Sequence, residues 1–175
     1  MKKVFVTGHN GYIGAHLVGL LKDKGYTVIG CDVNLFDGCQ WEDYQKPNTE
    51  LIKDLRDVTL EELEGVDCVM HLGALSNDPM GDIDENITFS INREGTIALA
   101  KKAKEAGVSR FLFSSSCSIY GKGEKLDLEE TDPTNPITAY AISKIASENA
   151  IMAMADDSFS PAFLRNATAY GHSPM

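Results

Sequence analysis

Short apolar runs rich in β-branched and aromatic residues recur along this chain, and longer polar or amphipathic stretches separate them. Runs of this length predict strands, and the stretches between them can hold crossover helices, so the pattern favours a parallel sheet. Gly25 and Gly107 stand where two of the predicted helices should end. The expected fold is α/β, a Rossmann-type doubly wound parallel sheet with helices on both faces. The predicted strands are Lys3–Thr7, Thr27–Asp32, Leu51–Leu55, Cys68–Ala74, Arg110–Ser116 and Pro161–Ala167, and the predicted helices are Gly11–Lys24, Thr59–Leu63, Ile87–Ala106 and Thr138–Ala155.

The first predicted strand leads into a glycine-rich turn that reads Thr-Gly-His-Asn-Gly-Tyr-Ile-Gly from Thr7 to Gly14. A helical apolar face that includes Ile13, Leu17 and Leu21 follows, so the turn lies between a strand and a helix. Glycines in that setting let backbone N–H groups approach a pyrophosphate at the positive end of the helix, which predicts a dinucleotide site. A glycine turn that merely packs a strand on a helix is the alternative. The predicted cofactor contacts here are Gly8, Asn10, Gly11, Tyr12, Ile13 and Gly14.

Asp32 closes the second predicted strand, about 20 residues after the glycine turn. A carboxylate at this position accepts hydrogen bonds from the adenosine ribose hydroxyls and repels a 2′-phosphate. No arginine stands beside it or in the glycine turn, so NAD is favoured over NADP. An aspartate that caps a turn at the end of a strand is an equally good alternative.

Tyr140 and Lys144 are spaced i, i+4 in the last predicted helix and therefore share one face. A lysine ammonium at that distance can lower the pKa of the phenol from its ordinary value near ~10, which would make Tyr140 an acid/base near neutrality. Such a pair on a solvated helix face is more common, so this spacing depends on the upstream motifs for its significance.

Further motifs accompany the Tyr/Lys pair. The glycine spacing is G-x-x-G-x-x-G, three serines at Ser114–Ser116 end the fifth predicted strand, and Tyr120-Gly121 follow. Taken together, these features resemble the extended short-chain dehydrogenase/reductase family, which includes nucleotide-sugar epimerases, dehydratases, decarboxylases and reductases. The resemblance spans essentially the whole chain.

The resemblance implies a set of site residues. Ser116 would hydrogen-bond the reacting oxygen, Tyr140 would exchange a proton with a sugar hydroxyl while hydride passes to or from the nicotinamide, and Lys144 would also bind the nicotinamide ribose. For Asn92, a helix-surface or capping amide is the alternative reading. The further cofactor contacts that the resemblance implies are Asp54, Leu55, Leu72, Gly73, Ala74, Ser76, Asn92 and Ser114.

Within the family, the expected activity is NAD-dependent epimerisation of a nucleotide-sugar through a transient keto intermediate. Dehydratases and decarboxylases of the family carry an acidic residue just after the catalytic serine, whereas Cys117 and Ser118 stand here, so elimination of water lacks its carboxyl group. An NAD-dependent nucleotide-sugar reductase or dehydrogenase is the first alternative, and a non-catalytic NAD(H)-binding protein is the alternative of another class. Thr168 replaces an asparagine that often touches the nucleotide-sugar, and Leu75–Pro79 is either a substrate-pocket segment or a plain loop.

The composition limits the partners. The chain has 175 residues, of which 43% are hydrophobic and 24% charged, as expected for one domain with its own core. A formal net charge of −10 argues against nucleic acid and anionic membranes as partners, and no stretch approaches the length of a membrane span. Four cysteines without C-x-x-C spacing suggest neither a zinc site nor a disulfide framework, so reduced thiols in the cytoplasm are expected. We expect one NAD-binding domain over residues 1–175, the family's C-terminal substrate-binding lobe being absent from this chain, and a homodimer in the full-length form.

Overall fold

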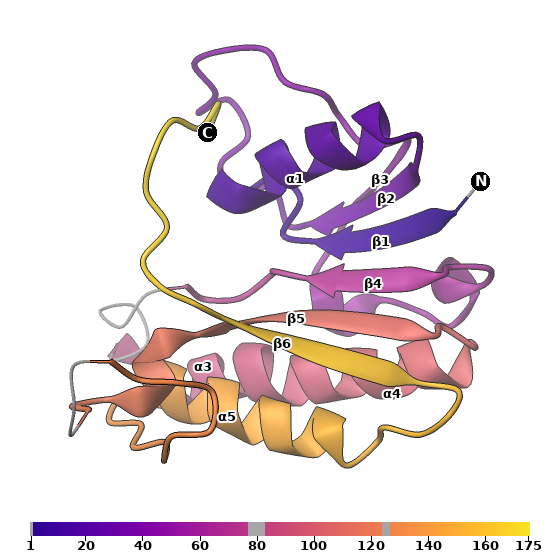
Figure 1. Ribbon diagram of the computed structural model, residues 1–175. Helices are drawn as coiled ribbons and strands as arrows, with labels where there is room; N and C mark the ends of the chain where they lie inside the picture. Colours follow the sequence, from indigo (N-terminus) through magenta and orange to yellow (C-terminus); the bar gives the residue numbers. More distant parts are fainter. Residues whose placement is uncertain (1, 77–82, 124–126) are drawn as a thin grey trace.

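The computed structural model describes residues 2–76, 83–123 and 127–175. Within these residues, six strands form one sheet in the order β3-β2-β1-β4-β5-β6, and all of the pairings are parallel (Figure 1). This is the strand order of a doubly wound dinucleotide-binding fold, so the predicted fold class is confirmed. The strands are β1 (Lys3–Thr7), β2 (Thr27–Asp32), β3 (Thr49–Ile52), β4 (Cys68–His71), β5 (Arg110–Ser116) and β6 (Ser160–Asn166).

Helices lie on both faces of the sheet. The α-helices are α1 (Tyr12–Asp23), α3 (Glu85–Thr88), α4 (Thr96–Glu105) and α5 (Ala139–Met152). The predicted helix at Thr59–Leu63 is only a 3₁₀ turn, Glu61–Leu63. No helix in the described part of the chain is both long enough and apolar enough to cross a membrane.

Three strands, β1, β2 and β5, have the predicted bounds, and β6 is displaced by one residue. The third strand was expected at Leu51–Leu55 but ends earlier, because the Asp54 carboxylate caps a 3₁₀ turn that takes the chain out of the sheet. The fourth strand was expected to reach Ala74 but ends at His71, where its partner Thr7 gives way to the glycine-rich turn. Both corrections leave Asp54 and Ala74 just beyond a strand end, where a ligand can approach them.

The predicted helix Ile87–Ala106 is interrupted. The chain forms α3, then a π-helical segment (Phe89–Gly95), and then α4. A π-helical segment often marks a functional site, and here the backbone carbonyl of Asn92 accepts a 3.1 Å hydrogen bond from the Ser147 hydroxyl on α5. Beyond the ends of α1 and α4, Gly25 (φ 79°) and Gly107 (φ 82°) take the left-handed conformation that the sequence predicted.

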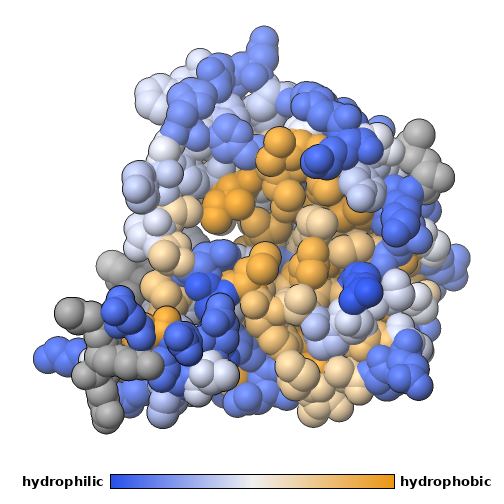
Figure 2. All heavy atoms as spheres, in the orientation of Figure 1, coloured by the Kyte–Doolittle hydropathy of each residue, from blue (hydrophilic) through white to orange (hydrophobic). Residues whose placement is uncertain are grey.

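The two faces of the sheet are covered unequally. The helices α3, α4 and α5 lie on one face, whereas α1 lies on the other face near β1 and β2 (Figure 1). Beyond α1 on that side, hydrophobic residues gather at the surface across the middle of the molecule (Figure 2). Leu20 of α1 is 59% exposed and Leu164 of β6 is 51% exposed.

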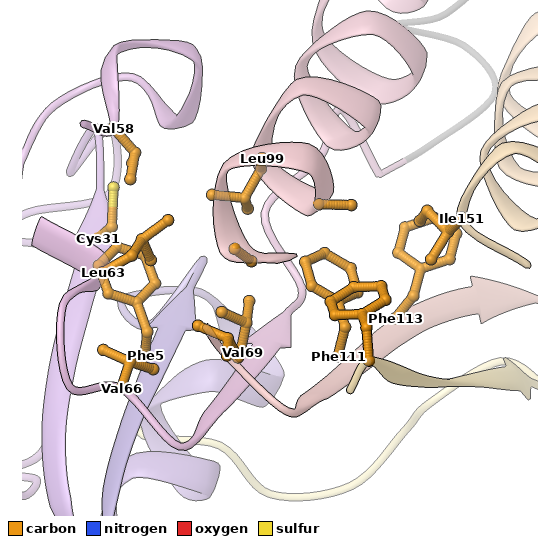
Figure 3. Close-up of a cluster of buried hydrophobic side chains, with 14 residues drawn as sticks. Phe5, Cys31, Val58, Leu63, Val66, Val69, Leu99, Phe111, Phe113 and Ile151 are labelled. Carbon is orange, nitrogen blue, oxygen red and sulfur yellow. The ribbon is translucent and has the colours of Figure 1, made fainter. Parts of the chain in front are cut away.

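The main core lies between the sheet and the helices α4 and α5 (Figure 3). Phe5 of β1 and Phe111 and Phe113 of β5 project into this layer and are completely buried, together with Leu99 of α4 and Ile151 of α5. Alternation along β1 sends its two valines to a smaller core beneath α1. Full burial of each large apolar side chain contributes roughly 1.5–3 kcal/mol, so the packed layers form a rigid base for the strand ends.

Candidate cofactor and acid/base site

A cavity of about 990 Å³ lies along the carboxyl ends of the strands, the edge at which doubly wound sheets bind ligands. Its volume is at the upper end of the range for small-molecule and cofactor sites. It brings the glycine-rich turn and the Tyr/Lys pair, more than a hundred residues apart in the chain, to one space. The predicted residues that line it are Gly8, Gly11, Tyr12, Ile13, Gly14, Asp32, Asp54, Leu55, Leu72, Gly73, Ala74, Ser76, Ser114, Ser116, Tyr140 and Lys144.

At Gly8 and Gly14 the glycine-rich turn lies too close to neighbouring backbone atoms to carry a side chain. Gly8 has φ 70°, and a Cβ atom there would lie 2.8 Å from the backbone nitrogen of Gly73. A Cβ atom on Gly14 would lie 2.0 Å from the carbonyl oxygen of Gly8. Gly11, the N-cap residue of α1, provides no side-chain cap for the first N–H groups of the helix. A backbone cradle with uncapped amides at the positive end of a helix fits a pyrophosphate.

Asp32 is already oriented at the end of β2. One carboxylate oxygen accepts a 3.1 Å hydrogen bond from the Asn10 backbone N–H, and the other accepts a 2.9 Å hydrogen bond from the Asn34 N–H. Each oxygen of a carboxylate can accept a further hydrogen bond, so Asp32 can still bind ribose hydroxyls from the cavity that it lines. These features fit the adenosine half of a dinucleotide.

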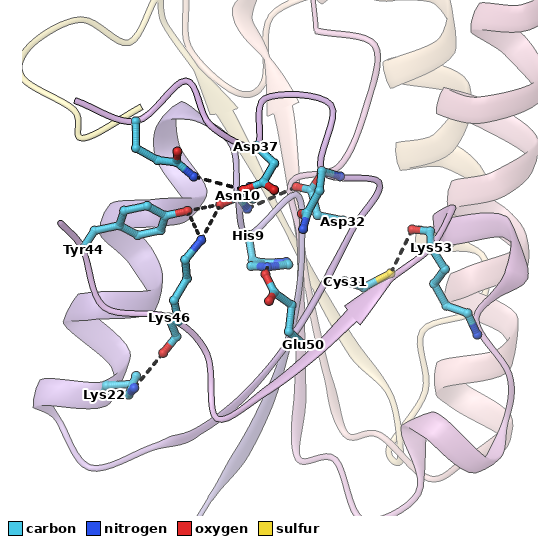
Figure 4. Close-up of polar contacts among 12 residues, drawn as sticks. His9, Asn10, Lys22, Cys31, Asp32, Asp37, Tyr44, Lys46, Glu50 and Lys53 are labelled. Atoms are coloured by element: carbon cyan, nitrogen blue, oxygen red, sulfur yellow. Dashed lines mark hydrogen bonds and ion pairs between the residues drawn. The ribbon is translucent and has the colours of Figure 1, made fainter. Parts of the chain in front are cut away.

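Asn10, a predicted cofactor contact, directs its side chain toward the loop before β3. This side chain does not line the cavity, and the residue is buried. The amide oxygen accepts a hydrogen bond from the Tyr44 hydroxyl, and the Lys46 ammonium lies 3.4 Å from the same oxygen (Figure 4). Only a tertiary fold could bring a cation from the loop before β3 to the glycine-rich turn.

Asn92 supports the site from behind rather than lining the cavity. Its amide oxygen accepts a 2.8 Å hydrogen bond from the Leu75 N–H, and its amide nitrogen donates a 2.9 Å bond to the Leu75 carbonyl. This pair of bonds fixes the segment after β4, whose residues Ala74 and Ser76 do line the cavity.

A second polar support is buried beneath the strand ends. The His71 ring lies between two hydroxyls, with Nδ1 2.6 Å from Thr7 Oγ1 and Nε2 2.7 Å from Thr96 Oγ1. Complete burial lowers the pKa of His71 to about 3, so the ring is neutral and ties β4 to β1 and α4.

Lys144 is buried, and its ammonium donates a 2.8 Å hydrogen bond to the Ser114 carbonyl. Burial lowers the pKa of Lys144 to about 8, while the nearby Glu148 carboxylate opposes that shift. The ammonium lies 5.5 Å from the centre of the Tyr140 ring, and both residues line the cavity. At neutral pH the site therefore holds a positive charge beside a phenol.

Ser116 is fixed at the end of β5. Its hydroxyl oxygen accepts a 3.2 Å hydrogen bond from the Ser118 N–H and lies 2.9 Å from the Ser118 hydroxyl. Both serines line the cavity, and Cys117 between them is an exposed free thiol that also lines it. The arrangement offers hydroxyl groups near the Tyr/Lys pair.

Sequence reasoning missed part of the cavity wall. Val33, Leu35 and Phe36 follow β2, line the cavity and are 45%, 74% and 60% exposed, which makes them available to an aromatic ring such as adenine. The apolar residues directly after the strand that ends in Asp32 were the sequence signal that could have identified this part of the wall. Asn166, at the end of β6, also lines the cavity, whereas residues 77–79 of the predicted pocket segment lie outside the described residues.

Comparison with known proteins assigns the chain to a family. A family model described as "NAD dependent epimerase/dehydratase family" matches residues 4–175. The chain belongs to this family. NAD is the family's cofactor, and the glycine cradle and the Asp32 carboxylate fit it.

Individual relatives agree with the assignment. The chain is 35% identical over 169 residues to a UDP-glucose 4-epimerase from Lactobacillus helveticus, an alignment that covers 88% of this chain and 47% of that protein. It is 29% identical to a mouse (Mus musculus) dTDP-D-glucose 4,6-dehydratase, with 84% of this chain and 44% of that protein covered. A solved UDP-glucose 4-epimerase from Stenotrophomonas maltophila, which contains NAD and formylated UDP-arabinopyranose, is 27% identical with a TM-score of 0.84 and covers 94% of this chain and 52% of that one. The chain thus spans about half the length of these relatives.

Across the described residues, no group of three or more histidine, cysteine or acidic side chains is placed to hold a metal ion.

Proposed function

We propose that this chain is the cofactor-binding part of an NAD-dependent epimerase that inverts one carbinol centre of a nucleotide-sugar through a transient keto intermediate. One observation carries the proposal: Ser116, Tyr140 and Lys144 line the same cavity as the glycine cradle and Asp32. NAD, when bound, supplies the hydride acceptor and returns the hydride to the sugar. The relatives named as UDP-glucose 4-epimerases support this substrate class.

The roles of the side chains follow from their environments. Tyr140 takes a proton from the sugar hydroxyl and later returns it, helped by the positive charge of Lys144. Lys144 stays in place because its ammonium is bonded to the Ser114 carbonyl. Ser116 donates its hydroxyl hydrogen to the reacting sugar oxygen, since its own oxygen already accepts the Ser118 N–H.

Dehydration is the less favoured chemistry for the same site. Loss of water needs a carboxyl group that protonates the leaving hydroxyl. Among the described residues that line the cavity, the carboxylates are Asp32 and Asp54, at the ends of β2 and just beyond β3, whereas Cys117 and Ser118 follow the catalytic serine. An epimerase needs no such acid.

We further propose that a substrate-binding lobe completes the functional protein. The chain spans about half of its relatives, and the apolar surface beyond α1 lacks a covering layer in the described part of the chain (Figure 2). The four free cysteines suit a reducing compartment, which for this protein would be the cytoplasm.

The test is a turnover assay on the longer protein. Mass spectrometry of the purified protein should detect bound dinucleotide, and a screen of UDP-, GDP- and dTDP-sugars should find one pair that interconverts at catalytic NAD without steady growth of NADH absorbance. Stoichiometric NADH consumption or production would instead support a reductase or dehydrogenase. Bound dinucleotide with no turnover on any nucleotide-sugar would support a non-catalytic binding protein.

A further inference from the structure

His9, in the middle of the glycine-rich turn, is completely buried, although its neighbours in the turn approach the cofactor cavity. Its ring lies over β2 at Gly30, where a Cβ atom would be only 2.5 Å from the imidazole Cγ. Gly30 is paired in register with Glu50 of the edge strand β3. The missing side chain at Gly30 therefore opens a path for the ring across β2 to β3.

At the end of this path, the Nε2 atom of His9 lies 2.9 Å from a carboxylate oxygen of Glu50 (Figure 4). Nε2 is the donor in this contact, since an ionised carboxylate can only accept. The hydrogen bond from His9 holds the pKa of Glu50 below its ordinary value. Nδ1 has no partner among the described residues, so within them Glu50 is the hydrogen-bond partner that holds this ring.

Glu50 also reaches the other side of the ribose-binding carboxylate. The Asn34 amide also helps to hold the pKa of Glu50 below its ordinary value, and the Asn34 backbone N–H donates to Asp32. Asn34 is a non-glycine residue with φ 55°, a conformation that needs support from its surroundings. On the opposite side, Asn10 follows His9 directly, and its N–H donates to the second oxygen of Asp32.

We propose that Glu50 is a positioning residue that sets the cofactor specificity of this site. It hydrogen-bonds His9 and interacts with the Asn34 amide, and the backbone N–H groups at Asn10 and Asn34 fix both oxygens of Asp32. Asp32 is thereby kept in the orientation that accepts two ribose hydroxyls and repels a 2′-phosphate. The proposal rests on the assignment of the adenosine ribose to Asp32 in the proposed function.

Removal of Glu50 should loosen this orientation. In Glu50→Ala, we expect the dissociation constant for NADH to rise about five- to tenfold, the effect of losing roughly one hydrogen bond to the ligand. NADPH should lose less affinity, because a mobile carboxylate can turn away from the 2′-phosphate. The ratio of the two dissociation constants should therefore fall toward one.

The experiment measures both dissociation constants by NADH and NADPH fluorescence titration and the unfolding midpoint of each variant in urea. Glu50→Gln should restore the wild-type ratio, since its amide oxygen can accept the same hydrogen bond from His9. Asp156→Ala is the control for lost stability: it removes a 2.5 Å contact with Lys104 and the cap of the turn before β6, outside the cavity lining. It should lower the midpoint and leave the ratio unchanged.

The outcomes separate this proposal from the assignment beneath it. A folded Glu50→Ala variant with the wild-type NADH affinity and ratio would overturn the positioning role, as would a Glu50→Gln variant as defective as Glu50→Ala. If Glu50→Ala does not fold, Asn34→Gly replaces it as the test variant. Glycine keeps the φ 55° backbone conformation, while the side-chain interaction with Glu50 is lost. An unchanged ratio of the two dissociation constants in Asn34→Gly would equally overturn the positioning role. Equal affinity of the unaltered chain for NADH and NADPH would contradict the assignment of Asp32 itself and, with it, this proposal.

Discussion

Replacement of Gly14 by alanine is the sharpest perturbation that the glycine cradle offers. The new Cβ atom would lie 2.0 Å from the Gly8 carbonyl oxygen, which would have to retreat by about 1.4 Å to reach an ordinary contact distance of 3.4 Å. That carbonyl accepts the Gly11 N–H at 3.2 Å, and the Gly8 N–H is bonded to the Cys31 carbonyl at 2.9 Å, so the retreat must break backbone contacts. Overpacking of this kind costs about 1–3 kcal/mol or more of unfolding free energy.

The same displacement moves the N–H groups that would hold the pyrophosphate of NAD. The loss of one hydrogen bond to a charged group weakens binding by about 1.5–3 kcal/mol, so Gly14→Ala should raise the NADH dissociation constant roughly 10- to 100-fold. Urea titration and NADH fluorescence titration measure the two effects.

Gly19→Ala on the same helix is the matched control. No atom outside its own helix lies within 4 Å of a Cβ atom at Gly19, and alanine is the better helix former by about 0.8–1.0 kcal/mol. This variant should keep its NADH affinity and gain a little stability. If Gly14→Ala bound NADH as tightly as Gly19→Ala and unfolded at the same urea concentration, the close approach of Gly8 and Gly14 would not be needed for the cofactor site.

In the longer protein, Tyr140→Phe should keep NADH affinity within about twofold and lose most turnover, because the ring remains while the acid/base hydroxyl is gone; near-normal turnover would assign the proton transfer to another group. Burial sets the folded pKa of Lys144 at about 8, below the ordinary 10.5, so the unfolded chain binds more protons between these values. The unfolding free energy of the unaltered chain should therefore rise with pH between these values more steeply than that of Lys144→Met. Identical slopes in the two proteins would show that Lys144 does not titrate in this window. Glu148→Ala should lower the unfolding free energy by about 3 kcal/mol, because the Arg165 guanidinium 2.8 Å away loses a buried carboxylate; a urea titration that finds less than about 1 kcal/mol would indicate an ordinary surface pair. Fluorescence titration of the unaltered chain should find tighter binding of NADH than of NADPH, since the Asp32 carboxylate repels a 2′-phosphate.

Much of the fold and of the cavity wall was predictable from local signals. The glycine-rich turn, the aspartate at a strand end and the i, i+4 Tyr/Lys pair each lie within one element, and parallel strands bring their carboxyl ends to one edge of a sheet. That the predicted wall residues meet in one cavity could therefore be predicted without any knowledge of side-chain contacts. The errors at β3 and β4 arose where a capping aspartate and the end of a neighbouring strand outweighed apolar character.

Other properties of the site depend on contacts between distant segments. The parallel dinucleotide fold and the position of the Tyr/Lys pair at its edge follow from the sequence alone, because spacing and residue type along single elements carry those signals. The burial that lowers the pKa of Lys144, the bonds of Asn92 to the Leu75 backbone and the reach of His9 across β2 to Glu50 depend on the assembled tertiary structure. The contact between His9 and Glu50, for example, requires the register of β2 with β3 and the space left by the missing side chain at Gly30. Both arise only when the sheet has assembled.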